Sequence, residues 1–223
     1  MTNKSDKRIL EKRYVEAIKC PDIHCFEYAR GIKELAQLCW DGSLRNGLKD
    51  LSFLNQFFRE AGRTMTAGAP CDHGYERQEN RRDFLKYLES IKEVIADTIL
   101  VPDSNYRWGT YYAPTDDFLA YLPYLKKEKY EAVVPVLNGG FFIGSLTAKS
   151  LGIENILPIK MSRYMHRNEN EQSLLPGFKY NFKNLKVLIV DDIRSFGRVE
   201  EEVEDLVKKL GPKRVDFIAG RDI

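Results

Sequence analysis

The sequence has little cysteine and no long hydrophobic stretch. Its 223 residues include four cysteines, all within the first 71 positions and not spaced as a disulfide framework, so we expect reduced thiols. No apolar run approaches the length of a membrane span, and the opening run MTNKSDKRILEKRY lacks the apolar core of a signal peptide. The formal net charge is only +2, which gives no strong signal for nucleic acid or for an acidic membrane surface. These shortages predict a soluble, cytoplasmic protein with no membrane partner.

One interpretation of the cysteines is a zinc site. Cys20 and Cys25 frame the run CPDIHC, and Cys71 lies two residues before His73. These spacings fit no common pattern of zinc ligands. Buried or idle cysteines are therefore the better interpretation.

The first hundred residues show the hydrophobic periodicity of helices. Amphipathic runs recur from Ser5 to about Leu100. Several phenylalanines recur at helical spacing, which is typical of a core: Phe53, Phe57, Phe58 and Phe84. We predict a helical domain over residues 1–100 and a second domain over residues 101–223.

The joint between these halves is rich in aromatic residues. The run from Val101 to Pro114 contains Tyr106, Trp108, Tyr111 and Tyr112. Two interpretations stay open: these rings pack against the second half of the chain, or they stack on a planar base.

The second half alternates short apolar runs with helical patterns. The apolar runs predict strands near residues 131–137, 155–161, 186–191 and 214–219. Helices are expected over DDFLAYLPYLKK, over FFIGSLTAKSLG and from Glu200 to Leu210. This order predicts an α/β fold with a parallel sheet and right-handed crossovers.

The stretch VLIVDDIRSFGRV, residues 187–199, carries the clearest chemistry. Four apolar residues suit a strand buried on both faces, and Asp191 and Asp192 follow at its carboxyl end. A loop then leads into a helix, whose free N–H groups favour an anion. The stretch resembles the 5-phosphoribosyl-1-pyrophosphate (PRPP) motif of type I phosphoribosyltransferases. By that resemblance the two acids hold the ribose hydroxyls of PRPP, and the loop wraps its phosphate with these residues: Arg194, Ser195, Phe196, Gly197, Arg198 and Val199.

A second motif, VLNGGFF, closes the strand predicted at residues 131–137. Its Asn138, Gly139 and Gly140 resemble the pyrophosphate-binding loop of the 6-oxopurine phosphoribosyltransferases. Glycines at such a turn permit unusual backbone conformations and the close approach of a ligand.

A third match lies after the strand predicted at residues 155–161. Ser162, Arg163 and Tyr164 match the string that opens the mobile loop over PRPP in the same family. The polar segment from Met165 to Asn184 has no apolar rhythm, so we expect a flap that closes over the ligand. Positive charge for the leaving pyrophosphate comes from four side chains: Lys160, Arg163, His166 and Arg167.

The resemblance implies a pentosyltransferase. Such an enzyme transfers the phosphoribosyl group of PRPP to a nitrogen base with Mg²⁺ and releases pyrophosphate. Asp191, Asp192 and Arg163 would be the catalytic residues, and the two aspartates would hold the metal. The expected partners are PRPP and a nucleobase, with a homodimer as one option for assembly.

Two departures from the family keep other functions open. Ser195 stands where the 6-oxopurine enzymes have an acid that works near the purine nitrogen, and a hydroxyl is no base near neutral pH. Glu200, Glu201 and Glu202 crowd the expected phosphate site and repel an anion. A non-catalytic module that senses PRPP or a nucleotide is the alternative, and an interaction protein that keeps only the fold is a third.

Overall fold

The computed structural model describes three parts of the chain. These are residues 56–62, five positions between residues 82 and 90, and residues 121–219 with gaps at 138, 162–173, 175–178, 193 and 195–197. They belong to two compact units, one within residues 1–109 and the other within residues 110–223, and each is treated by itself. The boundary predicted near residue 100 lies outside the described residues.

In the first unit, residues 56–62 form a helix. Phe57 and Phe58 are completely buried there, and their rings meet edge to face with centroids 5.6 Å apart. Burial of both rings agrees with their predicted place in a core. The four cysteines and His73 lie outside the described residues, as do the aromatic residues of the joint.

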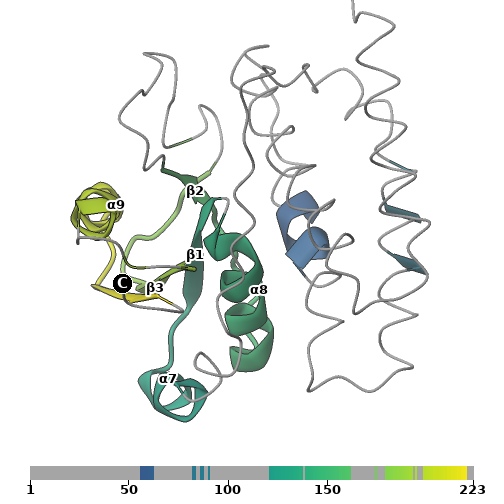
Figure 1. Cartoon of the computed structure of the whole chain (residues 1–223), viewed down its shortest axis with the longest axis horizontal. Coiled ribbons are helices and arrows are strands. Elements are labelled where there is room, and N and C mark those ends of the chain that lie inside the picture. Colours follow the sequence, from purple (N-terminus) through teal and green to yellow (C-terminus); the bar gives the residue numbers. More distant parts are fainter. Residues whose placement is uncertain are drawn as a thin grey trace, which may run out of the picture. The chain divides into compact units, whose positions relative to one another are not determined.

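The second unit is built on a four-stranded, wholly parallel sheet, as the sequence predicts (Figure 1). The strands are β1 (Ala132–Leu137), β2 (Ile159–Lys160), β3 (Lys186–Asp191) and β4 (Arg214–Ala219), in the order β2-β1-β3-β4. All six residues of β1 are buried, and so are the last five of β3. These two segments correspond to the continuous apolar runs of the sequence. A strand with a neighbour on each side and a helical layer on each face buries both of its faces, so it carries apolar residues at consecutive positions.

The strand β2 is shorter than the predicted range 155–161. Val133 pairs with this segment through its N–H to the carbonyl of Asn155 and its carbonyl to the N–H of Leu157. Pro135, two residues on, faces the same neighbour because strand residues alternate, and a proline has no N–H to donate. Pairing therefore lapses beside Pro135 and resumes at Val136.

Two helices cover opposite faces of this sheet. The helix α8 (Gly140–Leu151) connects β1 to β2, and α9 (Arg198–Lys208) connects β3 to β4. These crossovers run in opposite directions along the sheet, so right-handed connections place the helices on opposite faces. Figure 1 shows α8 and α9 on either side of the strands.

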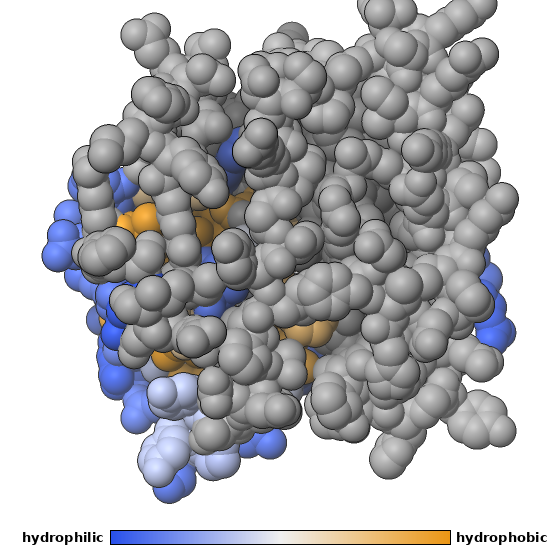
Figure 2. All heavy atoms as spheres, in the orientation of Figure 1, coloured by the Kyte–Doolittle hydropathy of each residue, from blue (hydrophilic) through white to orange (hydrophobic). Residues whose placement is uncertain are grey.

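The helix α9 is amphipathic. Val203 and Val207 are completely buried, whereas Glu201, Asp205 and Lys208 are exposed. The described atoms at the surface around α9 are mostly hydrophilic in the view of Figure 2. The helix begins two residues earlier than predicted, so Arg198 and Val199 lie in its first turn.

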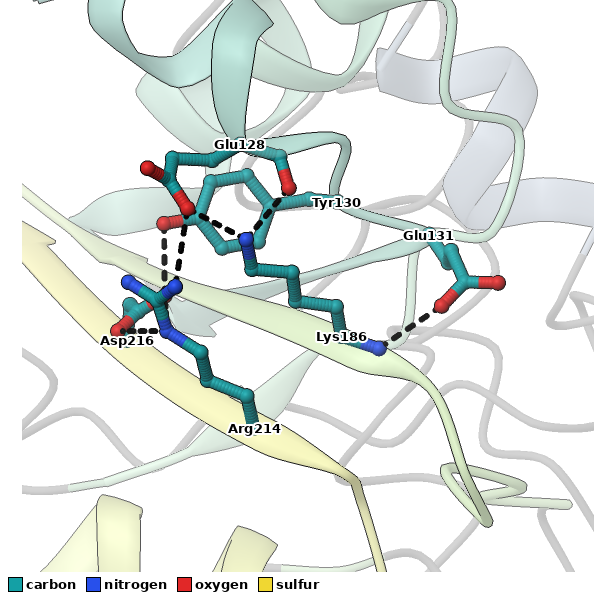
Figure 3. A network of polar contacts seen from close by, with 6 residues as sticks. All are labelled: Glu128, Tyr130, Glu131, Lys186, Arg214 and Asp216. Atoms are coloured by element: carbon teal, nitrogen blue, oxygen red, sulfur yellow. Dashed lines mark hydrogen bonds and ion pairs between the residues drawn. The ribbon is translucent and has the colours of Figure 1, made fainter.

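A polar network fixes the amino ends of the strands (Figure 3). The Lys186 ammonium bonds the carboxylate and the carbonyl of Glu128, the last residue of the helix α7 (Leu122–Glu128). Arg214 bonds Glu128 at 2.9 Å and Asp216 at 2.8 Å. Lys186 opens β3 and Arg214 opens β4, so the network ties α7 to two strands at the edge opposite the acid pair.

Tyr130 is the buried member of this network. Its hydroxyl donates a hydrogen bond to Asp216 at 2.8 Å, and the Lys186 ammonium lies 5.1 Å from its ring centroid. Burial, and then the bond to Asp216, raise the pKa of Tyr130 above its ordinary value. The bonds to Lys186 and Arg214 lower the pKa of Glu128.

The end of the predicted flap is packed. Phe182 is completely buried, and the Tyr180 hydroxyl donates to the carbonyl of Pro158 at 3.0 Å. Residues 179–184 therefore belong to the folded unit, and the segment 162–173 lies outside the described residues. Within the described part of the chain, no helix has both the length and the hydropathy that crossing a membrane requires.

Candidate functional site

The strand order places a switch point between β1 and β3. From β1 the chain crosses to β2 on one side, and from β3 it crosses to β4 on the other. The loops that leave the carboxyl ends of two such strands separate there, and ligands of open α/β sheets bind in the crevice that results. The loops concerned are those after Leu137 and Asp191, which carry the two predicted motifs.

The acid pair is buried at this edge. Asp191 is only 4% exposed and Asp192 is 8% exposed. The N–H of Asp192 donates to Oδ1 of Asp191 at 2.8 Å, and the chain bends at Asp192 as β3 ends. Burial of two adjacent carboxylates is costly unless they are hydrogen-bonded, paired or bound to a cation. The pair lies at the carboxyl end of β3, which is where ligands of open α/β sheets bind.

Gly139 and Gly140 press against the end of β3. A Cβ built on Gly139 would lie 2.2–2.3 Å from the carboxylate atoms of Asp192. A Cβ built on Gly140 would lie 2.2 Å from the carbonyl oxygen of Val190 and 2.7 Å from Cα of Asp191. The two predicted motifs thus meet in space, although more than fifty residues separate them in the sequence.

The reason for glycine at residue 139 is this close approach. Its φ of −56° and ψ of −55° are ordinary helical values that any residue adopts. The conformational freedom expected at the turn is therefore not used at Gly139. The Asp192 carboxylate also lies beside the first turn of α8, where the helix dipole favours a negative charge.

Arg194 contacts residues of α9 and β4. Its guanidinium pairs with Glu200 through two contacts of 2.9 Å and lies 5.6 Å from the ring centroid of Phe217 on β4. Arg194 was predicted to bind substrate as part of the PRPP loop, and that role stays a prediction; the pairing links residue 194 to α9 and β4. It also offsets the charge of Glu200, one of the three glutamates expected to repel a phosphate.

Lys160 is a buried cation at the same edge. It ends β2, lies in register with Leu137 of β1 and is 9% exposed. Of the four basic residues predicted to assist the leaving pyrophosphate, Lys160 is the one within the described part of the chain. The sequence places it at the end of a strand, but its burial could be learned only from the fold.

The remaining predicted site residues lie outside the described residues. They are Asn138, Ser162, Arg163, Tyr164, Ser195, Phe196 and Gly197. For Arg198 and Val199 the structure gives a place in the first turn of α9, where backbone N–H groups have no partner within the helix. Their roles toward a ligand stay predictions.

No protein-family model matches the chain. It is similar to the solved structure of a purine phosphoribosyltransferase from Pyrococcus horikoshii, at 21% identity and a TM-score of 0.42, over 52% of this chain and 85% of that one. It is similar to a hypoxanthine-guanine phosphoribosyltransferase from Bacillus anthracis, at 18% identity and a TM-score of 0.37, over 48% of this chain and 75% of that one. It is also similar to the L. donovani hypoxanthine-guanine enzyme, at 18% identity and a TM-score of 0.38, over 50% of this chain and 70% of that one. All three are phosphoribosyltransferases. At such identities the likeness says nothing of the substrate.

The donor set fits a magnesium ion that is shared with a ligand. Magnesium prefers oxygen, and it is commonly held by one or two carboxylates while phosphates and water complete its octahedron. Asp191 and Asp192 supply two carboxylates. Among the described residues no group of three or more acids, histidines or cysteines could hold a metal by itself. The pair thus suits a cation that arrives with a phosphorylated substrate.

Proposed function

We propose that the protein binds PRPP with Mg²⁺ at the carboxyl ends of β1 and β3. It then transfers the phosphoribosyl group to a nitrogen base and releases pyrophosphate. The contact of the Asp192 carboxylate with Gly139 carries this proposal, because it joins the predicted acid pair to the predicted pyrophosphate loop at the switch point.

The acid pair would orient the sugar. Asp191 and Asp192 would accept hydrogen bonds from the ribose hydroxyls or hold Mg²⁺, and the metal would supply positive charge beside the pyrophosphate oxygens. The first turn of α9 would offer its free N–H groups to the 5′-phosphate. These groups would hold the anomeric carbon in line with the base.

The leaving group needs positive charge. In the transfer, the bond from the anomeric carbon to pyrophosphate breaks, the new bond to the base nitrogen forms, and the proton of that nitrogen passes to water. Charge grows on the pyrophosphate as its bond breaks, so groups fixed beside it stabilise the transition state more than the ground state. The loop at Gly139 and Gly140 and the buried Lys160 lie at the edge where this charge would develop.

A PRPP-binding module without catalysis is the second candidate. It is favoured by Ser195, which stands where the 6-oxopurine enzymes have an acid. Such a module would keep the acid pair and the loop contact and would bind PRPP without turnover.

The release of pyrophosphate from PRPP separates these functions. We expect magnesium-dependent release that requires one base of a panel of purines and pyrimidines, and we expect the Asp191→Asn, Asp192→Asn double variant to lose it. Tight binding of PRPP without release with any base would support the sensing module. An absence of binding would contradict both.

A further inference from the structure

The contacts of Gly139 and Gly140 differ in kind. A Cβ on Gly140 would meet the backbone of β3, at the Val190 carbonyl oxygen and at Cα of Asp191. A Cβ on Gly139 would meet three side-chain atoms of Asp192, namely Oδ1, Cγ and Oδ2. Backbone in the middle of a sheet cannot give way, whereas a carboxylate can rotate about χ1 and χ2. A side chain at residue 140 would thus disturb the sheet, and one at residue 139 would move the acid.

From this difference we infer that Gly139 is a positioning residue for Asp192. The missing side chain at residue 139 leaves the space in which the carboxylate lies, so the backbone of the loop after β1 sets where the acid can be. The inference rests on the proposed function, because it assigns to this placement a consequence for the binding of PRPP and Mg²⁺.

The burial of Asp192 makes the placement restrictive. The residue is 8% exposed, so a displaced carboxylate would have to enter space that packed atoms already fill. A displaced carboxylate would lose a charge-assisted hydrogen bond to the ligand. We therefore expect Gly139→Ala to weaken the binding of PRPP and Mg²⁺ by about tenfold to a hundredfold.

A double-mutant cycle tests the inference. The variants are Gly139→Ala, Asp192→Ala and both together, and the measurements are chemical unfolding and calorimetric titration of PRPP with Mg²⁺ into the full chain. Asp192→Ala removes each of the three atoms that the new Cβ would meet. The factor by which Gly139→Ala raises the unfolding equilibrium constant should therefore be smaller by about tenfold or more in the Asp192→Ala background, which is an interaction of about 1.4 kcal/mol.

The same helix supplies a matched control. Gly144 also lacks room for a side chain, but its Cβ would meet Cβ and Cγ of Pro135 at 2.9 Å. Gly144→Ala should therefore cost the same with and without the Asp192 side chain. Its coupling to Asp192→Ala should be close to zero, and its affinity for PRPP should stay within about threefold of the wild type.

The titrations with PRPP distinguish a displaced Asp192 carboxylate from a direct collision between the new Cβ and the ligand. If the new Cβ only collided with the ligand, Gly139→Ala would weaken PRPP binding equally in the Asp192→Ala background, and the inference would be overturned. It would also be overturned by an additive unfolding cycle, or by an unchanged affinity in Gly139→Ala. A wild-type chain that does not bind PRPP at all would overturn the proposed function and this role toward its ligand together. In that case a coupled unfolding cycle would still show the steric contact, so the two failures can be told apart.

Discussion

At the scale of single residues, the proposed function depends most on the acid pair. Asp191 and Asp192 are almost completely buried, yet they lie at the end of a strand and not in its apolar middle. Asparagine has nearly the same shape and keeps hydrogen-bonding capacity while losing the charge. Asparagine at both positions thus removes the negative charge without leaving a cavity.

We expect the Asp191→Asn, Asp192→Asn double variant to fold and to bind PRPP poorly. Hydrogen bonds to charged groups contribute about 1.5–3 kcal/mol each, so the removal of one such bond lowers the affinity by about tenfold to a hundredfold. Calorimetric titration with Mg²⁺ would measure this decrease, and circular dichroism would check the fold. Affinities equal to those of the wild type would make the pair structural.

Tyr130 gives a prediction about alkaline pH. The pKa of Tyr130 is raised above the ordinary value of 10.0 by burial and by its bond to Asp216. Between that ordinary value and the raised one, the unfolded chain loses the phenol proton while the folded chain keeps it. Deprotonation then stabilises the unfolded state, so the contribution of Tyr130 is full below about pH 10 and is lost as the pH rises further.

The Tyr130→Phe variant should lack this component. Between about pH 9 and about pH 11 its unfolding free energy should fall less steeply than that of the wild type. Tyr124, 70% exposed, provides the matched control: Tyr124→Phe should follow the wild type. Urea unfolding at several pH values measures the slopes, and equal slopes in all three proteins would contradict the prediction.

At the scale of elements, continuous apolar runs located the strands and periodic runs located the helices. The runs around Val134 and Ile189 are buried on both faces, so their sequences show no alternation and are easy to recognise. The short β2 was harder to bound, because its length depends on Pro135 in the neighbouring strand. A local pattern cannot report which residue faces a proline across the sheet.

The helix α9 can be tested at this scale. Val203 is completely buried on the face that packs against β4, and Val203→Ala removes two methyl groups from that face. The variant should lose about 2 kcal/mol of unfolding free energy, from the transfer term and from the cavity left behind. Asp205→Ala on the exposed face should change stability by less than about 0.5 kcal/mol. A comparison of the two by chemical unfolding would check that the observed face is the buried one.

At the scale of the whole molecule, the sequence predicted what is local and missed what depends on contact between distant segments. The acid pair and the glycine loop could each be found from their own residues. Their meeting, in which Asp192 lies against Gly139, requires the strand order that makes β1 and β3 neighbours. The pairing of Arg194 with Glu200 was also missed, because a charge at the start of a helix suggests either a ligand or an ion pair.

Ligand binding should stabilise the unit that contains the sheet. A ligand that binds only the folded state adds about 2.7 kcal/mol when its free concentration is a hundred times the Kd. For a unit of about 110 residues each kcal/mol raises the melting temperature by about 4 °C, so PRPP with Mg²⁺ should raise the melting temperature of this unit by about 10 °C. The chain forms two compact units, so calorimetry that resolves two transitions should show the shift in the one that belongs to residues 110–223.

Chelation of the metal should remove most of the shift, because the ion offsets repulsion between the acid pair and the phosphates. The Asp191→Asn, Asp192→Asn variant should show little shift with or without metal. A shift of the same size in that variant would mean that PRPP stabilises the chain from elsewhere than the carboxyl ends of β1 and β3.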